Sequence, residues 1–422
     1  MSKRPAVFID RLGYSKEDRE LTNKEIVELN AAHVANTYGR FPIALVRGAG
    51  TRVWDADGRQ YLDFTSGLAV CNLGHCHPKV VAALQEQAGK LIHVSNLYHI
   101  EPQVVLAGLL TANSFADKVF FCNSGAEANE AAIKLARKYF SSKNDARYQI
   151  ITMEKSFHGR TLGALAATGQ KKFHAGFEPL LEKFTYVPFN DVEALGAAIG
   201  PDTAAVMLEP IQGEGGVNVP SATYLKKVRE ICDKAGVLLI FDEVQVGMGR
   251  TGTLFAYENY GATPDIMTLA KGLAGGVAIG AMCATDSVAA AFVPGAHAST
   301  FGGNPLATAA GSAALKAILD EGVLENCRAS GAYLVERLSG LKASYPFIKD
   351  IRGKGLIIGL ELGSELKDGA KAGDIVREAL SKGLLLNAVG DKILRFIPAL
   401  IVTKAEIDEM IEILEGIFSG IR

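Results

Sequence analysis

The sequence lacks the features that mark several large classes of protein. It has 44 lysine and arginine residues against 46 aspartate and glutamate residues, so no excess of positive charge points to nucleic acid. No apolar run approaches the roughly 18 residues of a membrane-spanning helix, and the first residues lack the apolar segment of a signal peptide. The six cysteines include no CxxC pair, which is typical of free thiols in a reducing compartment. We therefore expect a cytoplasmic protein that binds neither nucleic acid nor membranes.

Candidate metal ligands are also scarce. His75 and His77 stand two residues apart in GHCHP, but a zinc site needs further ligands at matching spacing, and the sequence contains no HExxH motif. A turn before a helix that begins at Pro78 is the better interpretation. We expect no metal.

The apolar segments that the sequence does contain predict an α/β fold. From about residue 65, short apolar runs alternate with stretches of helical periodicity. We expect a strand that runs into a turn within 118–125, and further strands at 148–153, 184–188, 204–208, 237–241, 265–270 and 279–284. Strands that alternate with helices in this way predict one large, mostly parallel seven-stranded sheet flanked by helices.

We divide the chain into three parts. Residues 65–315 form the large domain that contains this sheet, and residues 316–422 form a smaller α+β domain. In the second of these we expect a helix, two strands, a helix, two short strands and a final helix. Residues 1–64 are too short to fold alone, so we expect them to pack with the small domain; residues 50–64 have the pattern of a hairpin, and residues 1–20 are expected to be loosely ordered.

Two of the expected strands end in groups of opposite charge. The run 237–241 is followed by Asp242, and the run 266–270 is followed by Lys271. In open α/β sheets, ligands bind at the carboxyl ends of the strands. A pyridoxal phosphate enzyme needs this pair, because a lysine forms a Schiff base with the cofactor and an acid keeps its ring nitrogen protonated. A structural salt bridge at the sheet edge is the alternative.

Two further segments carry groups that suit a phosphorylated, carboxylate-bearing ligand. Ser124, Gly125 and Ala126 lie where a strand turns into a helix, and such turns bind anions through free N–H groups and the helix dipole. Phe157 can stack on a flat ring, and Arg160 can bind a carboxylate with its planar guanidinium group. The alternatives are an ordinary helix N-cap and a surface loop with a core phenylalanine.

Two glycine-rich loops add polar groups. Glu209 and Glu214 follow another buried strand, in MLEPIQGEGG. Thr300 lies in STFGGNP, where its hydroxyl and the glycine N–H groups suit a phosphate. The alternatives are two solvated acids and a turn before a helix.

One motif points to a different class of enzyme. GMGRTG, residues 247–252, matches the GxGxxG pattern of dinucleotide-binding proteins. However, Arg250 interrupts it, no helical pattern follows it, and Asp242 and Glu243 lie where a pyrophosphate would be. An NAD-dependent dehydrogenase is therefore a remote alternative. A catalytically silent binding protein is disfavoured because Lys271 and Asp242 are both present.

These motifs, in this order, resemble the class III (ω-amino acid) aminotransferases of the pyridoxal phosphate fold type I superfamily. The resemblance extends from about Gly39 to the C-terminus, and it implies the fold of that superfamily and pyridoxal phosphate as cofactor. It also implies that Lys271 bonds to the cofactor and that Asp242 pairs with the pyridine nitrogen. Gln245 is expected near the ring hydroxyl, and Phe157 is expected on the face of the ring.

The resemblance also implies a shared site in a homodimer. Ser124, Gly125 and Ala126 match the family's phosphate-binding turn. Thr300 matches a threonine that reaches the phosphate from the partner subunit, which makes a dimer necessary for function.

Within the class, the segments SGLAVCNLGHCHP, VSNLYHIEPQ, FFCNSGAEANEAAIKLARKY and LLLNAVGDKILRFIPAL resemble acetylornithine aminotransferases. The implied reaction moves the terminal amino group of N-acetylornithine to 2-oxoglutarate, giving N-acetylglutamate 5-semialdehyde and glutamate in arginine biosynthesis. Arg160 is then expected to bind the α-carboxylate of N-acetylornithine and Arg395 that of 2-oxoglutarate, with Glu214 as the switchable partner of Arg395. Leu68 aligns with a tyrosine of ornithine aminotransferases. Donors such as 4-aminobutyrate, ornithine and succinyl-diaminopimelate are the alternatives.

Overall fold

The computed structural model of the chain describes residues 21–363, 366 and 369–421. The expectation for residues 1–20 lies outside these ranges. In the described part of the chain, no helix combines the length and apolar character that crossing a membrane requires.

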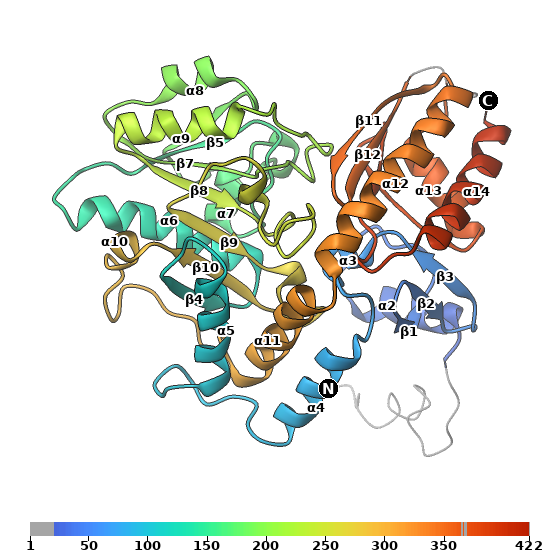
Figure 1. Cartoon of the computed structure of the whole chain (residues 1–422), viewed down its shortest axis with the longest axis horizontal. Coiled ribbons are helices and arrows are strands. Elements are labelled where there is room, and N and C mark those ends of the chain that lie inside the picture. The colour runs from blue at the N-terminus through green and yellow to red at the C-terminus, as the bar shows by residue number, and fades with distance from the viewer. Residues whose placement is uncertain (1–20, 364–365, 367–368, 422) are drawn as a thin grey trace, which may run out of the picture.

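A seven-stranded sheet forms the centre of the larger body of the molecule (Figure 1). Its strands are β4 (Lys118–Cys122), β5 (Gln149–Met153), β6 (Phe184–Val187), β7 (Thr203–Leu208), β8 (Leu238–Asp242), β9 (Ile266–Leu269) and β10 (Gly280–Ala284). Their order is β4-β10-β9-β8-β7-β5-β6. Within this sheet β10 pairs antiparallel with β4 and β9, while the pairs from β9 to β6 are parallel. The predicted mostly parallel sheet of seven strands is therefore confirmed.

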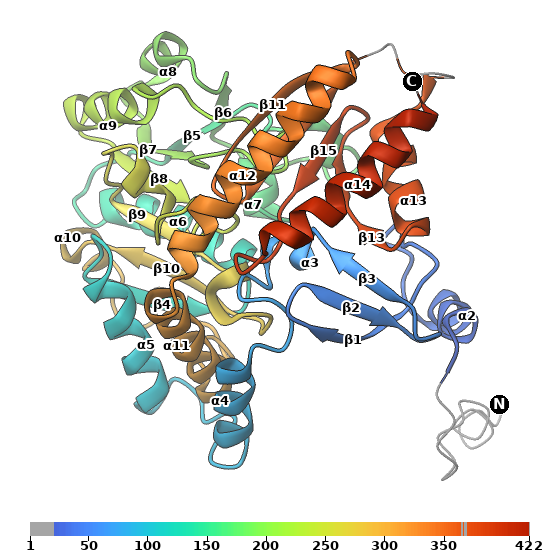
Figure 2. The same ribbon diagram turned by 45° about the vertical axis from the view of Figure 1, so that its right-hand side comes forward.

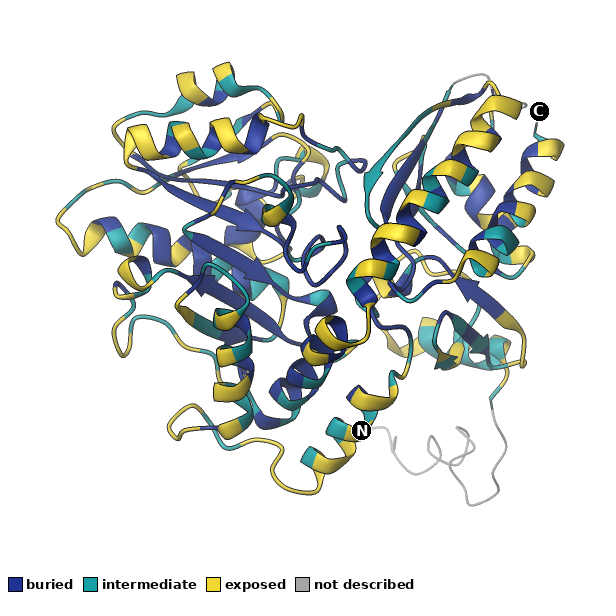
Figure 3. Cartoon of the chain, in the orientation of Figure 1, coloured by how far each residue is buried: buried dark blue, intermediate teal, exposed yellow. Residues whose placement is uncertain are grey.

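Helices cover both faces of this sheet (Figure 3). The helices of this body are α5 (Glu101–Ala112), α6 (Gly125–Ser141), α7 (Leu162–Ala167), α8 (Val192–Ala198), α9 (Tyr224–Ala235), α10 (Asp286–Ala289) and α11 (Pro305–Asp320), and α4 (Pro78–Ala88) packs on α11. Successive strand residues point to opposite faces, so Met207 of β7 packs in a cluster with α6, and Leu208 packs in a cluster with α9. Covering both faces explains why β7 and β8 are buried along their whole length.

The C-terminal part forms a second body with its own sheet, of order β11-β12-β15-β14 (Figure 2). Its elements are α12 (Val323–Ser344), β11 (Ile348–Lys354), β12 (Ile357–Leu362), α13 (Ala372–Ser381), β13 (Leu384–Leu385), β14 (Asn387–Val389), β15 (Ile393–Phe396) and α14 (Lys404–Gly420). Three short strands follow α13, where the sequence predicted two. The additional strand, β13, has only two residues and belongs to a different sheet.

A third sheet combines three strands of the N-terminal segment with one strand of the C-terminal part. It consists of β1 (Leu45–Ala49), β2 (Arg52–Asp55), β3 (Gln60–Asp63) and β13, and it follows helix α2 (Asn23–His33). Strands β2 and β3 are antiparallel, which confirms the predicted hairpin, and β13 pairs parallel with β3. Arg52 also binds Glu409 of α14 through two hydrogen bonds, of 2.7 and 2.5 Å. These contacts support the predicted packing of the N-terminal segment on the small domain, and the domain boundaries themselves stay a prediction.

Candidate active site

A cavity of about 420 Å³ opens at the carboxyl ends of the parallel strands. Nine of the predicted site residues line it: Ser124, Gly125, Ala126, Phe157, Arg160, Glu214, Asp242, Gln245 and Lys271. They come from segments that follow β4, β5, β7, β8 and β9. Arg395 does not line the cavity but binds two residues that do, and Thr300 lies outside it, exposed on the surface of the single chain.

Lys271 lies two residues after the end of β9 and is the first residue of the short 3-10 helix η3 (Lys271–Ala274). Its φ angle is 41°, in the left-handed region that non-glycine residues seldom occupy, and such strained positions concentrate at functional sites. Among the described residues, its amine has no hydrogen bond or ion pair. Burial lowers the pKa of Lys271 below its ordinary value. A larger share of the amine is therefore neutral near pH 7, as a nucleophile or general base requires.

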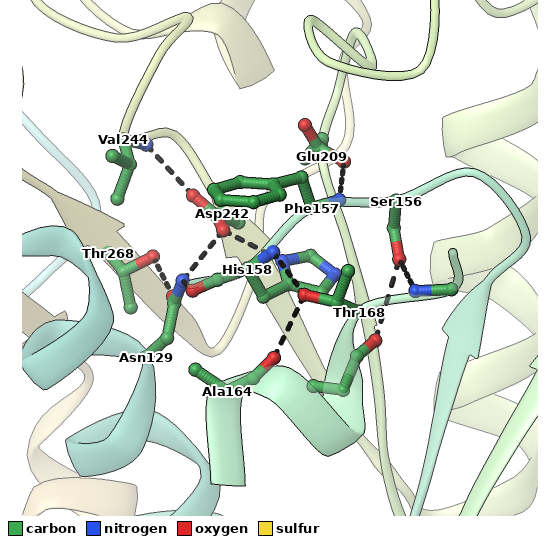
Figure 4. Close-up of polar contacts among 12 residues, drawn as sticks. Asn129, Ser156, Phe157, His158, Ala164, Thr168, Glu209, Asp242, Val244 and Thr268 are labelled. Atoms are coloured by element: carbon green, nitrogen blue, oxygen red, sulfur yellow. Dashed lines mark hydrogen bonds and ion pairs between the residues drawn. The ribbon is translucent and has the colours of Figure 1, made fainter. Parts of the chain in front are cut away.

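Asp242, the last residue of β8, is held by three donors (Figure 4). Its Oδ2 accepts hydrogen bonds from Asn129 Nδ2 at 2.8 Å and from His158 Nδ1 at 2.7 Å, and its Oδ1 accepts one from the Val244 N–H at 3.0 Å. Asn129 is itself fixed, because its Oδ1 accepts a 2.7 Å hydrogen bond from the hydroxyl of Thr268. The carboxylate that faces the cavity therefore has a defined orientation.

Sequence reasoning missed Asn129 and His158. Asn129 lies on the buried face of α6, among alanines, and His158 follows Phe157 in a loop. A buried polar residue on an apolar helix face is the one signal that marks Asn129, since such residues need hydrogen-bond partners. Within the described residues, Nε2 of His158 is buried without a partner.

The turn from β4 into α6 has the geometry of an anion site. The Oγ atom of Ser124, the N-cap, accepts a hydrogen bond from the Glu127 N–H at 3.2 Å. The N–H groups of Gly125 and Ala126 occupy the first helical positions, where no partner exists within the helix. A Cβ atom on Gly125 would lie 2.7 Å from Cγ1 of Val244, so a larger residue would push the helix away from the loop that follows β8.

Phe157 and Arg160 lie on the same side of the cavity. The Phe157 N–H donates to Oε2 of Glu209 at 3.0 Å, which fixes the backbone that carries the ring. The guanidinium carbon of Arg160 lies 4.0 Å from the centre of the Phe173 ring. In the part of the chain that the structure describes, Arg160 has no carboxylate partner, so its charge is available to a ligand.

Arg395, which is buried, and Glu214, which is partly exposed, form an ion pair at the cavity wall. Arg395 is 1% exposed, and its Nη1 donates to Oε1 of Glu214 at 2.6 Å and to Oε1 of Gln245 at 3.1 Å. Its Nε and Nη2 both donate to Oδ1 of Asn387. Burial alone would raise the pKa of Glu214, but the charge and hydrogen bond of Arg395, together with Lys271 and Gln245, outweigh burial and lower the pKa below its ordinary value.

The comparison with known families agrees with this arrangement. The model of the family described as "Aminotransferase class-III" matches residues 33–418. The chain belongs to the class III aminotransferases.

Individual class III relatives cover nearly the whole chain. An acetylornithine aminotransferase from Caldanaerobacter subterraneus subsp. tengcongensis is 56% identical over 92% of this chain and 98% of that protein. One from Methanocaldococcus jannaschii is 50% identical over 95% of this chain and 100% of that protein. The N-acetylornithine aminotransferase structure from Stenotrophomonas maltophilia K279a has 41% identity and a TM-score of 0.80, covering 93% and 98% of the two chains. An ornithine aminotransferase structure from Toxoplasma gondii, with pyridoxal phosphate at its active site, has 34% identity and a TM-score of 0.92, covering 100% and 99%.

Fold type, enzyme class and cofactor are thus confirmed: the chain is a pyridoxal-phosphate-dependent aminotransferase. The residues at the cavity fit that cofactor. Lys271 offers a free amine, Asp242 offers an oriented carboxylate, and the turn at Gly125 offers unpaired N–H groups for a phosphate. The role of each residue stays a prediction.

The GMGRTG motif has a structural role in this class III aminotransferase. Arg250 is fully buried, and its Nη1 donates to the carbonyl oxygens of Leu356 and Pro398, while its Nη2 donates to Oδ1 of Asn72 at 2.6 Å. These partners lie far from Arg250 in the sequence, so its hydrogen bonds connect the loop after β8 to the segments that contain Asn72, Leu356 and Pro398. The first helical element after the motif is the short 3-10 helix η2 (Ala256–Asn259), not the helix that a dinucleotide-binding turn opens.

The two histidines of GHCHP bind different carboxylates. Nε2 of His75 lies 2.8 Å from Oδ2 of Asp63, and Nε2 of His77 lies 3.2 Å from Oε2 of Glu321. His77 is the N-cap of α4, which begins at Pro78 as predicted.

Proposed function

We propose that this aminotransferase moves the terminal amino group of N-acetylornithine to 2-oxoglutarate, giving N-acetylglutamate 5-semialdehyde and glutamate. The observation that carries the proposal is the 50 to 56% identity to acetylornithine aminotransferases over 89 to 95% of the chain. Structural similarity does not discriminate between amino donors. The ornithine aminotransferase structure has a TM-score of 0.92, above the 0.80 of the N-acetylornithine aminotransferase structure. On this proposal the enzyme acts in arginine biosynthesis, in the cytoplasm.

The two arginines support a pair of substrates with different shapes. N-acetylornithine carries one carboxylate, far from the amine that reacts, whereas glutamate carries a carboxylate beside the reacting amine and a second one at its far end. Arg160 is exposed at the cavity without a carboxylate partner, so it suits the distant carboxylate of either substrate. Arg395 is paired with Glu214, so it becomes available only when Glu214 moves away.

The surroundings of Leu68 support an acylated donor. Leu68 is exposed and has a φ of 66°, in a turn of left-handed residues that leads to Val70 at the cavity. An apolar side chain there offers no hydrogen bond to a free α-amino group. Acylation removes the charge of that group and leaves only the distal amine nucleophilic.

The residues of the chain divide the chemical work between them. Pyridoxal phosphate, when bound, supplies the electron sink that stabilises a carbanion next to nitrogen. Lys271 Nζ takes the proton from the carbon that bears the reacting amino group and returns a proton later, which its lowered pKa favours. Asp242, oriented by Asn129 and His158, provides the negative charge for the ring nitrogen.

We also propose a homodimer in which Thr300 completes the partner's site. Asn96 Nδ2 donates to the carbonyl oxygens of Ser299 and Gly302, so the loop before α5 supports the segment that contains Thr300. Large apolar side chains on these two segments are exposed in the single chain: Leu97 (84%), Tyr98 (66%) and Phe301 (60%). Contiguous exposed apolar surface of this kind marks interaction sites.

A panel of amines tests the substrate. We expect the kcat/KM of the purified holoenzyme for N-acetylornithine to be at least tenfold above that for ornithine, 4-aminobutyrate or succinyl-diaminopimelate. The reaction with each amine is also measured by absorbance as a single-turnover half-reaction. An equal or higher value for ornithine would contradict the proposed donor but leave the aminotransferase class intact. If N-acetylornithine is the preferred donor but 2-oxoglutarate is not converted to glutamate, the proposed acceptor is wrong.

A further inference from the structure

Glu209 is a buried acid to which the reaction described above gives no role. It follows β7 directly, is 6% exposed and lines the same cavity as Lys271 and Asp242. Figure 4 shows its side chain beside the backbone of Phe157. An acid in this position is close enough to the reacting groups for its protonation state to matter.

The two carboxyl oxygens of Glu209 have different surroundings. Oε2 accepts the 3.0 Å hydrogen bond from the Phe157 N–H. In the described part of the chain Oε1 has no hydrogen-bond partner, and no cation forms an ion pair with either oxygen. One oxygen therefore supports Phe157, and the other is left for whatever occupies the cavity.

The charges around Glu209 disfavour a second carboxylate. Asp242 already supplies one negative charge, fixed by three donors, and the charge of Glu214 is taken up by Arg395. A buried carboxylate with a single N–H donor is costly, so the group takes up a proton instead. Burial raises the pKa of Glu209 well above its ordinary value and the charges of Asp242 and Glu214 add to this, while the Phe157 N–H and Lys271 act in the opposite direction.

We propose that Glu209 is a positioning residue that works as a neutral carboxylic acid. Its Oε2 holds the backbone of Phe157, and its protonated oxygen offers a hydrogen-bond donor to an acceptor atom of the cofactor or substrate in the cavity. This assignment does not depend on which amine is the donor, so it stands or falls separately from the proposed substrate.

Three variants separate this role from a general structural one. Glu209→Gln keeps both an acceptor for the Phe157 N–H and a neutral donor, whereas Glu209→Ala removes both. Glu243→Gln is the control for damage outside the cavity, because Glu243 is another buried acid, just after β8, that does not line the cavity. Its two oxygens accept from the N–H groups of Ala256 and Tyr257, so the single acceptor of an amide should lower Tm there without changing either assay. Each variant is assayed as holoenzyme for single-turnover rate and for retention of pyridoxal phosphate on dilution.

We expect Glu209→Gln to stay within about threefold of the parent enzyme in both assays. Glu209→Ala should lose about tenfold or more in cofactor retention, because a buried N–H left without a partner costs that much. The infrared difference spectrum of the parent minus Glu209→Gln at pH 7 should contain the C=O band of a protonated carboxyl group. Because Glu209 should ionise as the pH rises, the parent should lose activity at alkaline pH where Glu209→Gln does not.

Two results would overturn the assignment. A carboxylate band in place of the C=O band would show that Glu209 is ionised. Losses in Glu209→Gln as large as those in Glu209→Ala, with Glu243→Gln unaffected, would show that the site needs the negative charge.

Discussion

Nδ1 of His158 lies 2.7 Å from Oδ2 of Asp242, and both side chains are buried (Figure 4). Both residues line the cavity, Asp242 from the end of β8 and His158 from the loop after β5. Asn129 donates to the same oxygen from α6. Helix α6 and the loop after β5, together with the Val244 N–H, thus fix the direction in which one carboxylate points, as expected for a group predicted to face a fixed ring nitrogen.

Substitution of Asp242 should reduce the chemical step more than the stability of the fold. An amide in Asp242→Asn cannot keep a proton on the ring nitrogen, so we expect a loss of about 10²-fold or more in single-turnover rate, the scale found when an electrostatic group acts in the transition state. His158→Asn should lose less, about tenfold, because Asn129 and the Val244 N–H still orient the carboxylate. A larger loss in His158→Asn than in Asp242→Asn would contradict this order.

Lys271 should react at a lower pH than lysines on the surface. Burial lowers its pKa, whereas the ion pair with Glu321 raises that of Lys79. In cofactor-free enzyme, reductive methylation with formaldehyde should therefore modify Lys271 at a pH at which Lys79 is still protected, as peptide mass spectrometry can measure. Lys271→Ala should abolish transamination, and turnover at the parent rate would refute its role.

The ion pair of His75 and Asp63 should make stability depend on pH. The hydrogen bond to Asp63 is the largest cause that raises the pKa of His75 from its ordinary 6.5 to about 10. A group whose pKa is raised on folding stabilises the fold fully below its unfolded value, and this contribution is lost as the pH rises through the folded value. The difference in Tm between the parent and His75→Asn should therefore be largest near pH 6 and decrease toward pH 10. A constant difference over this range would argue against an imidazolium.

The central sheet could be predicted because each strand carries its own signal. Segments such as Leu238–Asp242 are apolar along their whole length, which is what burial on both faces requires. Parallel strands end at one edge, so Asp242 and Lys271 could be expected in one cavity before any contact was known. Strand β13 has only two residues and carries no such pattern. It pairs with β3, where Leu384 lies opposite Leu62, so the two strands are far apart in the sequence.

The hydrogen-bond network of the site could not be predicted in the same way. Glu214 and Arg395 are 181 positions apart, and only the family resemblance related them. Glu209 and His158 have no local pattern that separates a buried partner from a solvated side chain, because their surroundings are created by the tertiary packing. Thr300 is exposed in one chain, so its expected role depends on a second subunit.

Mixed dimers can test whether subunits share a site. Thr300→Ala should weaken retention of pyridoxal phosphate more than it lowers Tm, because the exposed side chain makes little contact within its own subunit. A Thr300 variant bulky enough to be inactive is then co-expressed with the inactive Lys271→Ala chain. Heterodimers isolated with two affinity tags should recover one working site. Confirmed heterodimers without activity would count against sharing.

The pairing of Arg395 with Glu214 predicts unequal effects on the two half-reactions. On the proposed function, Arg395 binds the carboxylate beside the reacting centre of 2-oxoglutarate, and N-acetylornithine has no carboxylate there. Arg395→Ala should therefore slow the 2-oxoglutarate half-reaction strongly and largely spare the N-acetylornithine one. Removal of one partner of a buried charge pair typically costs ~2–5 kcal/mol, so the two losses should differ by more than tenfold in single-turnover rates.

Arg160 provides the matched comparison for this prediction. It is exposed at the cavity without a carboxylate partner among the described residues, so it is free to bind the distant carboxylate of both substrates. Arg160→Ala should therefore slow both half-reactions to a similar degree. Arg160→Lys should restore only part of the loss, because an ammonium group lacks the planar pair of donors that fits a carboxylate. If Arg395→Ala slows both half-reactions equally, the two arginines do not have separate roles. In that case the pairing of Arg395 with Glu214 would not depend on which substrate is bound.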